Sequence, residues 1–376
     1  MMAQGNRILF ILHLPPPVHG AAMMGSYLKQ CKGLNEQFEC RYVNLTSASD
    51  LTDIGKASFS KILKYFRLLW NVRKEVKCFS PDLVYITPNA CAPAFYKDFL
   101  MVQILKMMGS PVVAHYHNKG VATRQNHSID NFLYKSFFKS LKLILLSDRI
   151  YPDVQKYVSL NDVYFCPNGI PNQEIVNTDN HNSIPQMLFL SNLLVSKGVY
   201  VLLDALHILR ERNSRFICHF VGGETKEISK DKLQQEILKR RLDDVVFYHG
   251  SKTGLEKNIF LDEADLFVFP TYSDCFPLVL LEAMQHGLPC VSTNEGAIAS
   301  IIEEGKTGFV VEKGNPRQLA QKLELLLQDE NLRKFMGQAG KKKFEEEYTL
   351  DIFEKRMVEV FHQIINTINS HSYNTK

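Results

Sequence analysis

The segment that decides the fold reads Pro270-Thr-Tyr-Ser-Asp274-Cys-Phe-Pro277-Leu-Val-Leu-Leu-Glu282-Ala-Met-Gln-His-Gly-Leu-Pro289. The apolar run that leads into it, Leu266–Pro270, predicts a short buried strand. A polar loop follows, and we expect a helix to start near Pro277 because proline is favoured in the first helical turn. A second apolar run, Pro289–Thr293, comes after the helix. This order of strand, helix and strand is typical of a parallel α/β layer.

The same alternation runs through most of the 376 residues. It predicts strands at Arg7–His13, Asp82–Thr87, Pro111–His115, Lys142–Ser147 and Val163–Cys166 in the first half of the chain. In the second half it predicts strands at Met187–Ser191, Phe216–Val221, Val245–His249, Leu266–Pro270, Pro289–Thr293 and Phe309–Glu312.

The two series of strands indicate two separate doubly wound parallel sheets. The segment Pro167–Ser183 between them is rich in Asn, Pro, Gly and Asp, which is typical of a linker. We therefore expect one Rossmann-like domain over 1–175 and a second over 183–350. The stretch 319–368 is helical by its apolar period, with Gly337 and Gly340 as candidate break points. Its last part, 351–376, predicts a helix that needs a partner surface, for which the first domain is one candidate.

Composition excludes several classes of protein. The chain is 45% hydrophobic and 22% charged, which argues against disorder, and its net charge of +4 is too small to indicate a nucleic-acid binder. No apolar run approaches the roughly 18 residues that span a bilayer, and the N-terminus does not resemble a signal peptide. The 8 cysteines form no CxxC pair and are expected to be reduced thiols. The composition thus indicates a cytoplasmic protein of two domains.

The helix expected near Pro277 carries candidate binding groups. The backbone N–H groups of Leu278 and Val279 would be free to hold a phosphate at its N-terminus. Glu282 lies about a turn further on among apolar residues, where a carboxylate is costly unless it is partnered, and a ribose diol would be a fitting partner. Asp274 precedes the helix and could orient a sugar. The alternative is an ordinary helix cap with one exposed glutamate.

Two other loops follow expected strands. Gly20 stands where a helix begins after the first strand, so that backbone could approach a ligand, but the loop lacks GxGxxG and gives no support to a nicotinamide dinucleotide site. Lys197 precedes Gly198 at another helix start, where it could neutralise a diphosphate. An ordinary turn and a solvated lysine are the alternatives.

The histidines His115 and His117 lie at the end of a third strand, on the same face. No nearby Cys, Asp or Glu completes a metal site, so we expect none. A neutral histidine could instead hydrogen-bond a sugar hydroxyl or polarise a reacting group. We predict this function for His117 and a structural role for the other.

Together these motifs resemble the retaining glycosyltransferases of the GT-B fold often called family 4, or glycosyl transferases group 1. The family's hallmark is an acidic residue, seven residues and then Glu, which here is Asp274 to Glu282. Further matches are Pro167-Asn-Gly-Ile170, Lys197-Gly198, Asn294-Glu-Gly296 and Glu304-Gly-Lys-Thr-Gly308. The resemblance covers nearly the whole chain and is strongest from about 186 to 350. It implies two Rossmann-like domains that face a central cleft.

The resemblance implies roles for particular residues. Glu282 would hold the nucleotide ribose, and Asp274 would contact the donor sugar. Lys197 would neutralise the diphosphate, assisted by backbone at Gly20 and at Leu278–Val279.

Two further assignments and two departures follow from the same resemblance. His117 matches the family's sugar-contacting histidine, and the base would lie against Val245–Ser251, with Ser251 at its end. The first acidic residue of the spaced pair is usually Glu, and Asp274 is one methylene shorter. Asn192 replaces a common arginine, which puts more weight on Lys197 as the cation for the leaving diphosphate.

The implied reaction is the transfer of a hexosyl unit from a nucleotide diphosphate sugar to a saccharide hydroxyl. A UDP-sugar is the first candidate for the donor. The anomeric configuration would be retained. We expect no metal and no cofactor beyond the donor, and a role in bacterial-type surface polysaccharide or lipopolysaccharide synthesis. A GT-B nucleotide-sugar epimerase and a catalytically silent saccharide-binding subunit are alternatives.

Two stretches combine basic and aromatic residues, Phe59–Phe79 and Asn131–Leu141. Such helices can lie on an anionic membrane surface. We therefore expect a lipid-linked acceptor and a peripheral location on the inner face of the cell membrane. The alternative is that both are core-facing helices with ordinary solvated lysines.

Overall fold

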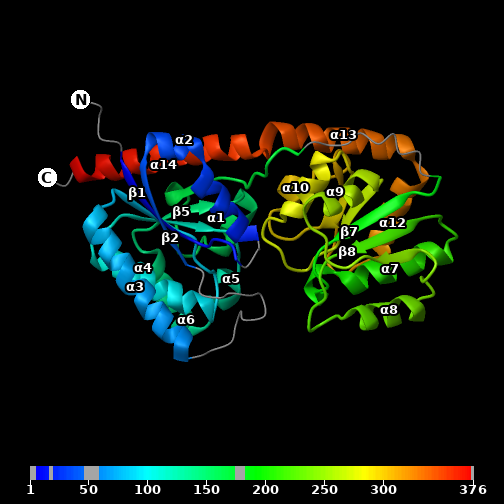
Figure 1. Cartoon of the computed structure of the whole chain (residues 1–376), viewed down its shortest axis with the longest axis horizontal. Helices are drawn as coiled ribbons and strands as arrows, with labels where there is room; N and C mark the ends of the chain where they lie inside the picture. The colour runs from blue at the N-terminus through cyan, green and yellow to red at the C-terminus, as the bar shows by residue number, and fades with distance from the viewer. Residues whose placement is uncertain (1–5, 17–19, 46–58, 174–182, 374–376) are drawn as a thin grey trace. The chain divides into compact units, whose positions relative to one another are not determined.

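The computed structural model describes residues 6–16, 20–45, 59–173 and 183–373, with only the backbone of 59–61 and 371–373. The chain forms two compact units (Figure 1). Unit 1 comprises Met1–Asn168 and Leu350–Lys376, and unit 2 comprises Gly169–Thr349. The chain passes from one unit to the other at Asn168, inside the segment expected as the linker, of which 174–182 lie outside the described residues.

Unit 1 contains a parallel sheet of six strands in the order β2-β1-β3-β4-β5-β6. Strands β1, β3, β4 and β5 are almost wholly buried, because helices cover both faces of the sheet. The edge strand β2 was not predicted, since its exposed polar and charged residues alternate with less exposed ones and leave no apolar run. The strands are β1 Arg7–Leu12, β2 Glu39–Asn44, β3 Leu83–Ile86, β4 Val112–Tyr116, β5 Lys142–Leu145 and β6 Val163–Phe165.

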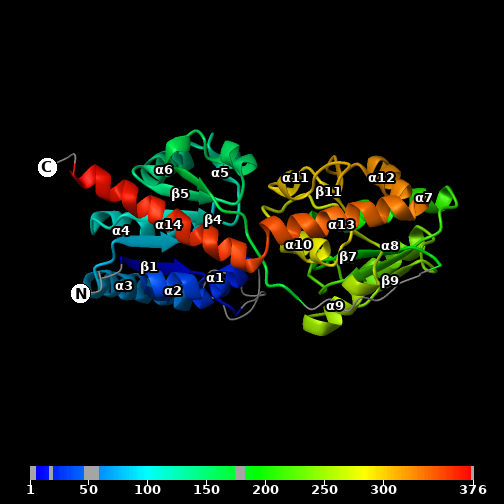
Figure 2. The same cartoon turned by 90° about the horizontal axis from the view of Figure 1, so that it is seen from above.

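The helices of unit 1 lie on the two faces of its sheet (Figures 1 and 2). One face carries α1 (Gly20–Gln30), α2 (Lys32–Gln37) and α14 (Leu350–Tyr373). The other carries α3 (Phe59–Phe79), α4 (Ala94–Met107) and α6 (Ser128–Phe138). Three short helical segments complete the unit. They are α5 (Val121–Arg124) after β4, η2 (Asp148–Asp153) after β5, and η3 (Leu160–Asp162) before β6.

Helix α14 packs on the first unit through an aromatic cluster. The ring of Phe361 meets those of Phe10, Phe38 and Tyr85 edge-on, with centroids 5.6, 6.1 and 5.7 Å apart. Phe361 and its helical neighbour Met357 are fully buried. Helix α14 is therefore part of the core of unit 1.

Unit 2 contains a second parallel sheet of six strands, in the order β12-β11-β10-β7-β8-β9. The sequence winds outward from β7 in one direction and from β10 in the other, so these two neighbours flank the point where the strand order reverses. In such sheets ligands bind at this point, beyond the carboxyl ends of the strands. The strands are β7 Gln186–Leu190, β8 Ile217–Val221, β9 Val246–Tyr248, β10 Leu266–Phe269, β11 Cys290–Thr293 and β12 Gly308–Val311.

The helices of unit 2 also form two layers (Figure 1). Helix α12 (Pro316–Gln328) contacts α7 (Val199–Glu211), and α8 (Lys230–Lys239) follows on the same side. Helix α13 (Glu330–Glu347) contacts α10 (Leu278–Gln285), beside α9 (Gly254–Glu263). The short elements are η4 (Val195–Lys197) and α11 (Ile298–Ile301). Within the described residues, none of the helices is both long and apolar enough to cross a bilayer.

Gly337 and Gly340 do not break the helix, and that expectation was wrong. Both lie inside α13. The helical stretch 319–368 is interrupted instead at Asp329, before α13, and between Glu347 and Leu350, after it. Gly337 is required by packing, because a Cβ atom there would lie 1.9 Å from the carbonyl oxygen of Gly287. At Gly340 the nearest atom to an added Cβ is 3.7 Å away, which is ordinary contact.

These two glycines give a matched pair of variants. We expect Gly337→Ala to lower the free energy of unfolding by about 1–3 kcal/mol, because backbone must move. Gly340→Ala should leave it unchanged or raise it by up to about 1 kcal/mol, since alanine favours the helix. Urea unfolding of the full chain measures both, and equal midpoints for the two variants would contradict the packing described for α13.

Candidate functional site

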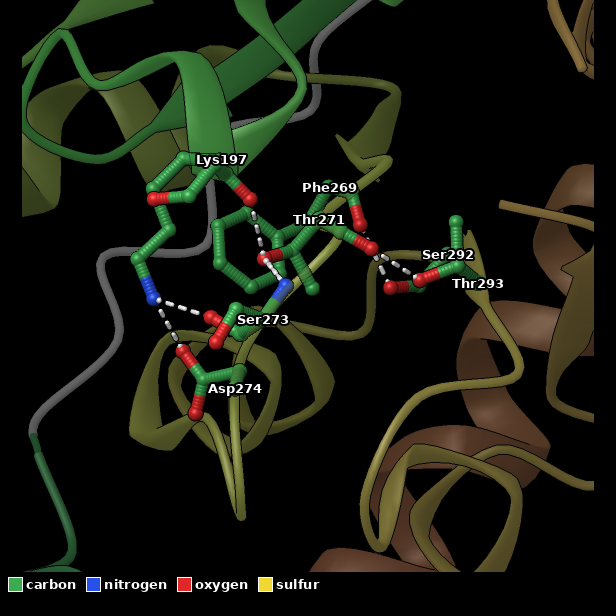
Figure 3. Close-up of polar contacts among 8 residues, drawn as sticks. Lys197, Phe269, Thr271, Ser273, Asp274, Ser292 and Thr293 are labelled. Carbon is green, nitrogen blue, oxygen red and sulfur yellow. Dashed lines mark hydrogen bonds and ion pairs between the residues drawn. The ribbon is translucent and has the colours of Figure 1, made fainter. Parts of the chain in front are cut away.

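The loops that follow β7 and β10 meet at the reversal point of the second sheet. The carbonyl oxygen of Ser196 accepts hydrogen bonds from the backbone N–H of Tyr272 at 2.7 Å and from the hydroxyl of Thr271 at 3.1 Å. Figure 3 shows Thr271 together with the side chains around it. The two loops are thus fixed to one another at the place where a ligand would bind.

Two buried hydroxyls hold the end of β10 from the neighbouring strand. Ser292 donates to the carbonyl oxygen of Phe269 at 2.5 Å, and Thr293 donates to that of Thr271 at 2.6 Å (Figure 3). Both side chains are fully buried. The loop that follows β10 therefore starts from a rigid point.

Gly198 allows the loop that carries Lys197 to lie close to the end of β10. Its φ is +82°, and a Cβ atom would lie 2.0 Å from the carbonyl oxygen of Pro270. Glycine alone allows the loop after β7 to approach β10 so closely before α7 begins. This approach brings the preceding residue, Lys197, over the loop after β10.

Lys197 and Asp274, predicted separately as site residues, form an ion pair. The Nζ atom lies 2.6 Å from Oδ2 of Asp274 and 3.0 Å from the carbonyl oxygen of Ser273 (Figure 3). It also lies 5.6 Å from the ring centroid of Phe269. Both charged side chains are about one-fifth exposed, at 21% and 20%. The ammonium group is therefore fixed in place but remains within reach of a ligand.

Helix α10 begins at Leu278, with Pro277 as its N-cap, close to the predicted position. Among the residues that the structure describes, no side chain caps this end, so no such cap engages the first-turn N–H groups of Leu278 and Val279. Both residues are half-buried. The helix start offers backbone donors to an anion.

Glu282 lies inside the same helix, between the buried residues Leu281 and Ala283. Its side chain is only 17% exposed. Oε1 lies 2.8 Å from Nζ of Lys257 on α9. Oε2 is buried and, within the described part of the chain, has no hydrogen-bond partner. A buried carboxylate oxygen in this state is suited to accept a hydrogen bond from a ligand.

A pocket of about 390 Å³ opens beyond the ends of β8 and β9. Asn192 borders it, since its Oδ1 accepts a hydrogen bond from the backbone N–H of Gly223 at 3.1 Å. Ser251, the predicted base contact, is in its wall. The lining residues are Gly223, Glu224, Lys230, Tyr248, His249, Gly250 and Ser251.

The histidines near this pocket carry little charge. Nδ1 of His219 lies 2.9 Å from Nε2 of His249. Burial lowers the pKa of His219 to about 4, and it also lowers the pKa of His249. At neutral pH both rings are therefore uncharged, and this side of the pocket suits a neutral group better than a phosphate.

The remaining predicted residues, Gly20 and His117, belong to unit 1. Gly20 is the first residue of α1, and a Cβ atom there would meet nothing within 4 Å. His115 is fully buried, its Nδ1 lies 2.8 Å from the hydroxyl of Tyr85, and burial lowers its pKa well below the usual value. His117 is half-buried, with its ring centroid 4.2 Å from that of His115.

Sequence reasoning missed Lys257 and the hydroxyls of Ser292 and Thr293. Lys257 lies 25 residues before Glu282 (282 − 257 = 25) on a different helix, and no motif links them. The one available signal was that a glutamate in an apolar helix requires a partner.

Among the described residues, no group of three or more His, Cys, Asp or Glu side chains is placed to hold a metal ion.

Comparison with known proteins identifies the family. The sequence model described as glycosyl transferases group 1 matches residues 173–343, which lie within unit 2. Unit 2 is a group 1 glycosyltransferase domain. It holds the spaced pair of Asp274 and Glu282 on which the resemblance rested.

The chain has curated relatives. The capsular polysaccharide biosynthesis glycosyltransferase CapM of Staphylococcus aureus is 28% identical over 178 residues. That stretch covers 47% of this chain and 46% of the relative, so the chain matches about half the length of the relative.

Solved structures share the fold of the whole chain. Sucrose-phosphate synthase from Thermosynechococcus elongatus superposes with a TM-score of 0.76 at 15% identity, over 96% of this chain and 100% of that one. Anabaena HepE, solved in complex with UDP, gives a TM-score of 0.74 at 16% identity, over 95% and 100% of the two chains. The predicted fold class, GT-B with two Rossmann-like units, is confirmed.

Proposed function

We propose that the chain is a glycosyltransferase that binds a nucleotide diphosphate sugar in unit 2 and transfers the hexosyl unit to a saccharide hydroxyl. The observation that carries the proposal is the buried Oε2 of Glu282, which lacks a partner in the described chain and follows a helix N-terminus by about a turn. The name of the CapM relative favours a role in bacterial surface polysaccharide or lipopolysaccharide synthesis.

The diphosphate would be bound by Lys197 and by the first turn of α10. The ammonium group and the N–H groups of Leu278 and Val279 supply charge and donors to its oxygens. Asp274 neutralises Lys197 in the structure. When the diphosphate takes over that lysine, the carboxylate of Asp274 becomes available to accept hydrogen bonds from the donor sugar.

The nucleoside would contact the residues next to the diphosphate. The ribose hydroxyls would donate to Oε2 of Glu282. The base would enter the pocket walled by Ser251 and bordered by Asn192, whose neighbouring histidines are uncharged. UDP in the HepE complex favours uracil as this base. We therefore propose a UDP-sugar as the donor.

The transfer would proceed with retention of the anomeric configuration and without a metal ion. Lys197 and the start of α10 would compensate the charge that develops on the departing diphosphate, which is the main electrostatic demand of the step. Positioning of the acceptor hydroxyl would supply most of the remaining rate enhancement.

The ribose contact can be measured through donor binding. UDP should raise the melting temperature of the chain, because a ligand that binds only the folded state stabilises it. Glu282→Gln should weaken UDP binding by about 10- to 100-fold, since hydrogen bonds to a charged group contribute about 1.5–3 kcal/mol. Isothermal titration calorimetry gives the dissociation constants. Glu303→Gln, at a glutamate paired with Lys306 and Lys343, is the control and should bind UDP like the wild type.

A single transfer assay tests the finer chemistry. With a UDP-hexose donor and a saccharide acceptor, product should form at the same rate in EDTA as without it. The ¹H NMR coupling constant at the new linkage should show the anomeric configuration of the donor. Activity that requires a divalent cation, or a product of inverted configuration, would refute the corresponding part of the proposal.

Helix α3 favours an acceptor held at a membrane. Its outward face carries Leu63, Phe66 and Trp70, with exposed fractions of 56%, 60% and 65%. Its inward face is apolar and buried. Exposed cations lie around the aromatic residues, and a recess of about 340 Å³ adjoins Trp70. The recess is lined by Trp70, Arg73, Lys74, Lys77 and Cys78.

The second basic-aromatic stretch is largely core. Tyr134, Phe137 and Phe138 of α6 are buried, and of the aromatic residues in this helix only Phe132 is exposed, at 71%. Helix α3 is therefore the surface we propose for peripheral contact with an anionic membrane and hence for access to a lipid-linked acceptor.

Vesicle sedimentation tests this contact. At low salt the chain should sediment with phosphatidylglycerol vesicles but not with phosphatidylcholine vesicles, because the cations of α3 are attracted to the anionic surface. Replacing Phe66 and Trp70 with serine should abolish sedimentation. Replacing Leu255 and Ile259, exposed apolar residues of unit 2, should not. Wild-type protein that stays in the supernatant with anionic vesicles would rule the contact out.

A further inference from the structure

We propose that Lys257 is a positioning residue of the donor site, which anchors Oε1 of Glu282 so that Oε2 is presented to the ribose hydroxyls. The inference rests on the proposed function, because it assigns the ribose to Glu282. It adds a residue from a helix that none of the recognised motifs includes.

Helix α9 contacts α10 through polar side chains. Of the ten residues of α9, only Leu261 is buried. Two polar contacts connect it to α10 and the C-cap of that helix. Nζ of Lys257 lies 2.8 Å from Oε1 of Glu282, and Nδ1 of His286 lies 2.7 Å from Oδ1 of Asp262. These contacts lie five residues apart on α9, and four apart from Glu282 of α10 to its C-cap (262 − 257 = 5, 286 − 282 = 4), so the two helices run side by side in the same direction. The side of α10 that bears Glu282 therefore faces α9.

The geometry of the pair leaves one oxygen for a ligand. Lys257 and Glu282 are 19% and 17% exposed, so both charges are largely withdrawn from water. A carboxylate held at one oxygen loses its freedom to rotate about the last side-chain bond. The other oxygen, Oε2, then keeps one orientation while it remains buried without a partner in the described chain. Such preorganisation lowers the entropy that ribose binding would otherwise cost.

Loss of the lysine would undo this arrangement. In Lys257→Met the carboxylate of Glu282 would stand unpaired between Leu281 and Ala283, and an unpaired, partly buried charge is strongly disfavoured. The side chain would turn toward solvent or take up a proton, and either change removes the acceptor from its place. Recognition of the ribose would then be lost although Glu282 is still present.

The test compares nucleotides with and without the ribose hydroxyls. Calorimetry gives dissociation constants for UDP, GDP and ADP and for their 2′,3′-dideoxy forms. For the nucleotide that the wild type binds, we expect the ribose form to bind about 10-fold or more tightly than the dideoxy form. This ratio should fall to about 1 in Lys257→Met and in Glu282→Gln. It should be largely retained in Lys257→Arg, which keeps the cation.

Two further variants separate positioning from folding. The double variant Lys257→Met/Glu282→Gln has no unpaired charge, and its ratio should equal that of Glu282→Gln alone. Lys343→Met removes another largely buried lysine of unit 2, which is 11% exposed and pairs with Glu303 at 3.1 Å. Its ratio should match the wild type. Melting temperatures show whether each variant folds.

The outcomes are distinct. If Glu282→Gln loses the ratio and Lys257→Met keeps it, the role of Lys257 is overturned while the proposed function stands. If Lys257→Met weakens ribose and dideoxy forms equally, Lys257 supports the fold or touches the diphosphate, and the inference is likewise overturned. If no nucleotide binds the wild type, or Glu282→Gln keeps the ratio, the proposed function fails and the inference with it.

Discussion

A largely buried carboxylate in an apolar helix is the constraint on which the site of unit 2 depends. Glu282 is only 17% exposed between two buried neighbours, and within the described residues only one of its oxygens has a partner. A group of this kind destabilises a domain unless something binds it. Lys257 supplies part of that partnership, and the ribose of a donor nucleotide would supply the rest. The helix that carries Glu282 also begins at the point where a diphosphate would lie.

The second organising feature is the close approach of the loops after β7 and β10. Gly198 permits it, and the carbonyl oxygen of Ser196 fastens it through two hydrogen bonds. The result is a lysine paired with an aspartate at the reversal point of the sheet. This pair holds the cation in position, and in the proposed function Lys197 would exchange the carboxylate of Asp274 for the diphosphate of the donor. The family resemblance puts Asn192 where an arginine is common, which would put more weight on Lys197.

Much of this was predictable from the sequence. The apolar runs located the predicted strands to within about two residues, and the spaced acidic pair pointed to the family, because both depend on local pattern. The edge strand β2 was missed because its exposed residues leave no apolar run. The reason for a glycine at position 337 inside α13 was missed because it lies in a carbonyl group 50 residues earlier in the chain (337 − 287 = 50). Lys257 was missed for the same reason, since only the packing of α9 beside α10 pairs it with Glu282.

A crystal structure of the chain with bound UDP tests the central claim most directly. The account predicts the ribose hydroxyls within hydrogen-bond distance of Oε2 of Glu282, with the diphosphate against the start of α10 and Nζ of Lys197. Asp274 would no longer be paired with that lysine. A nucleotide bound with its ribose away from Glu282, while Oε2 stays buried and unpartnered, would contradict the account.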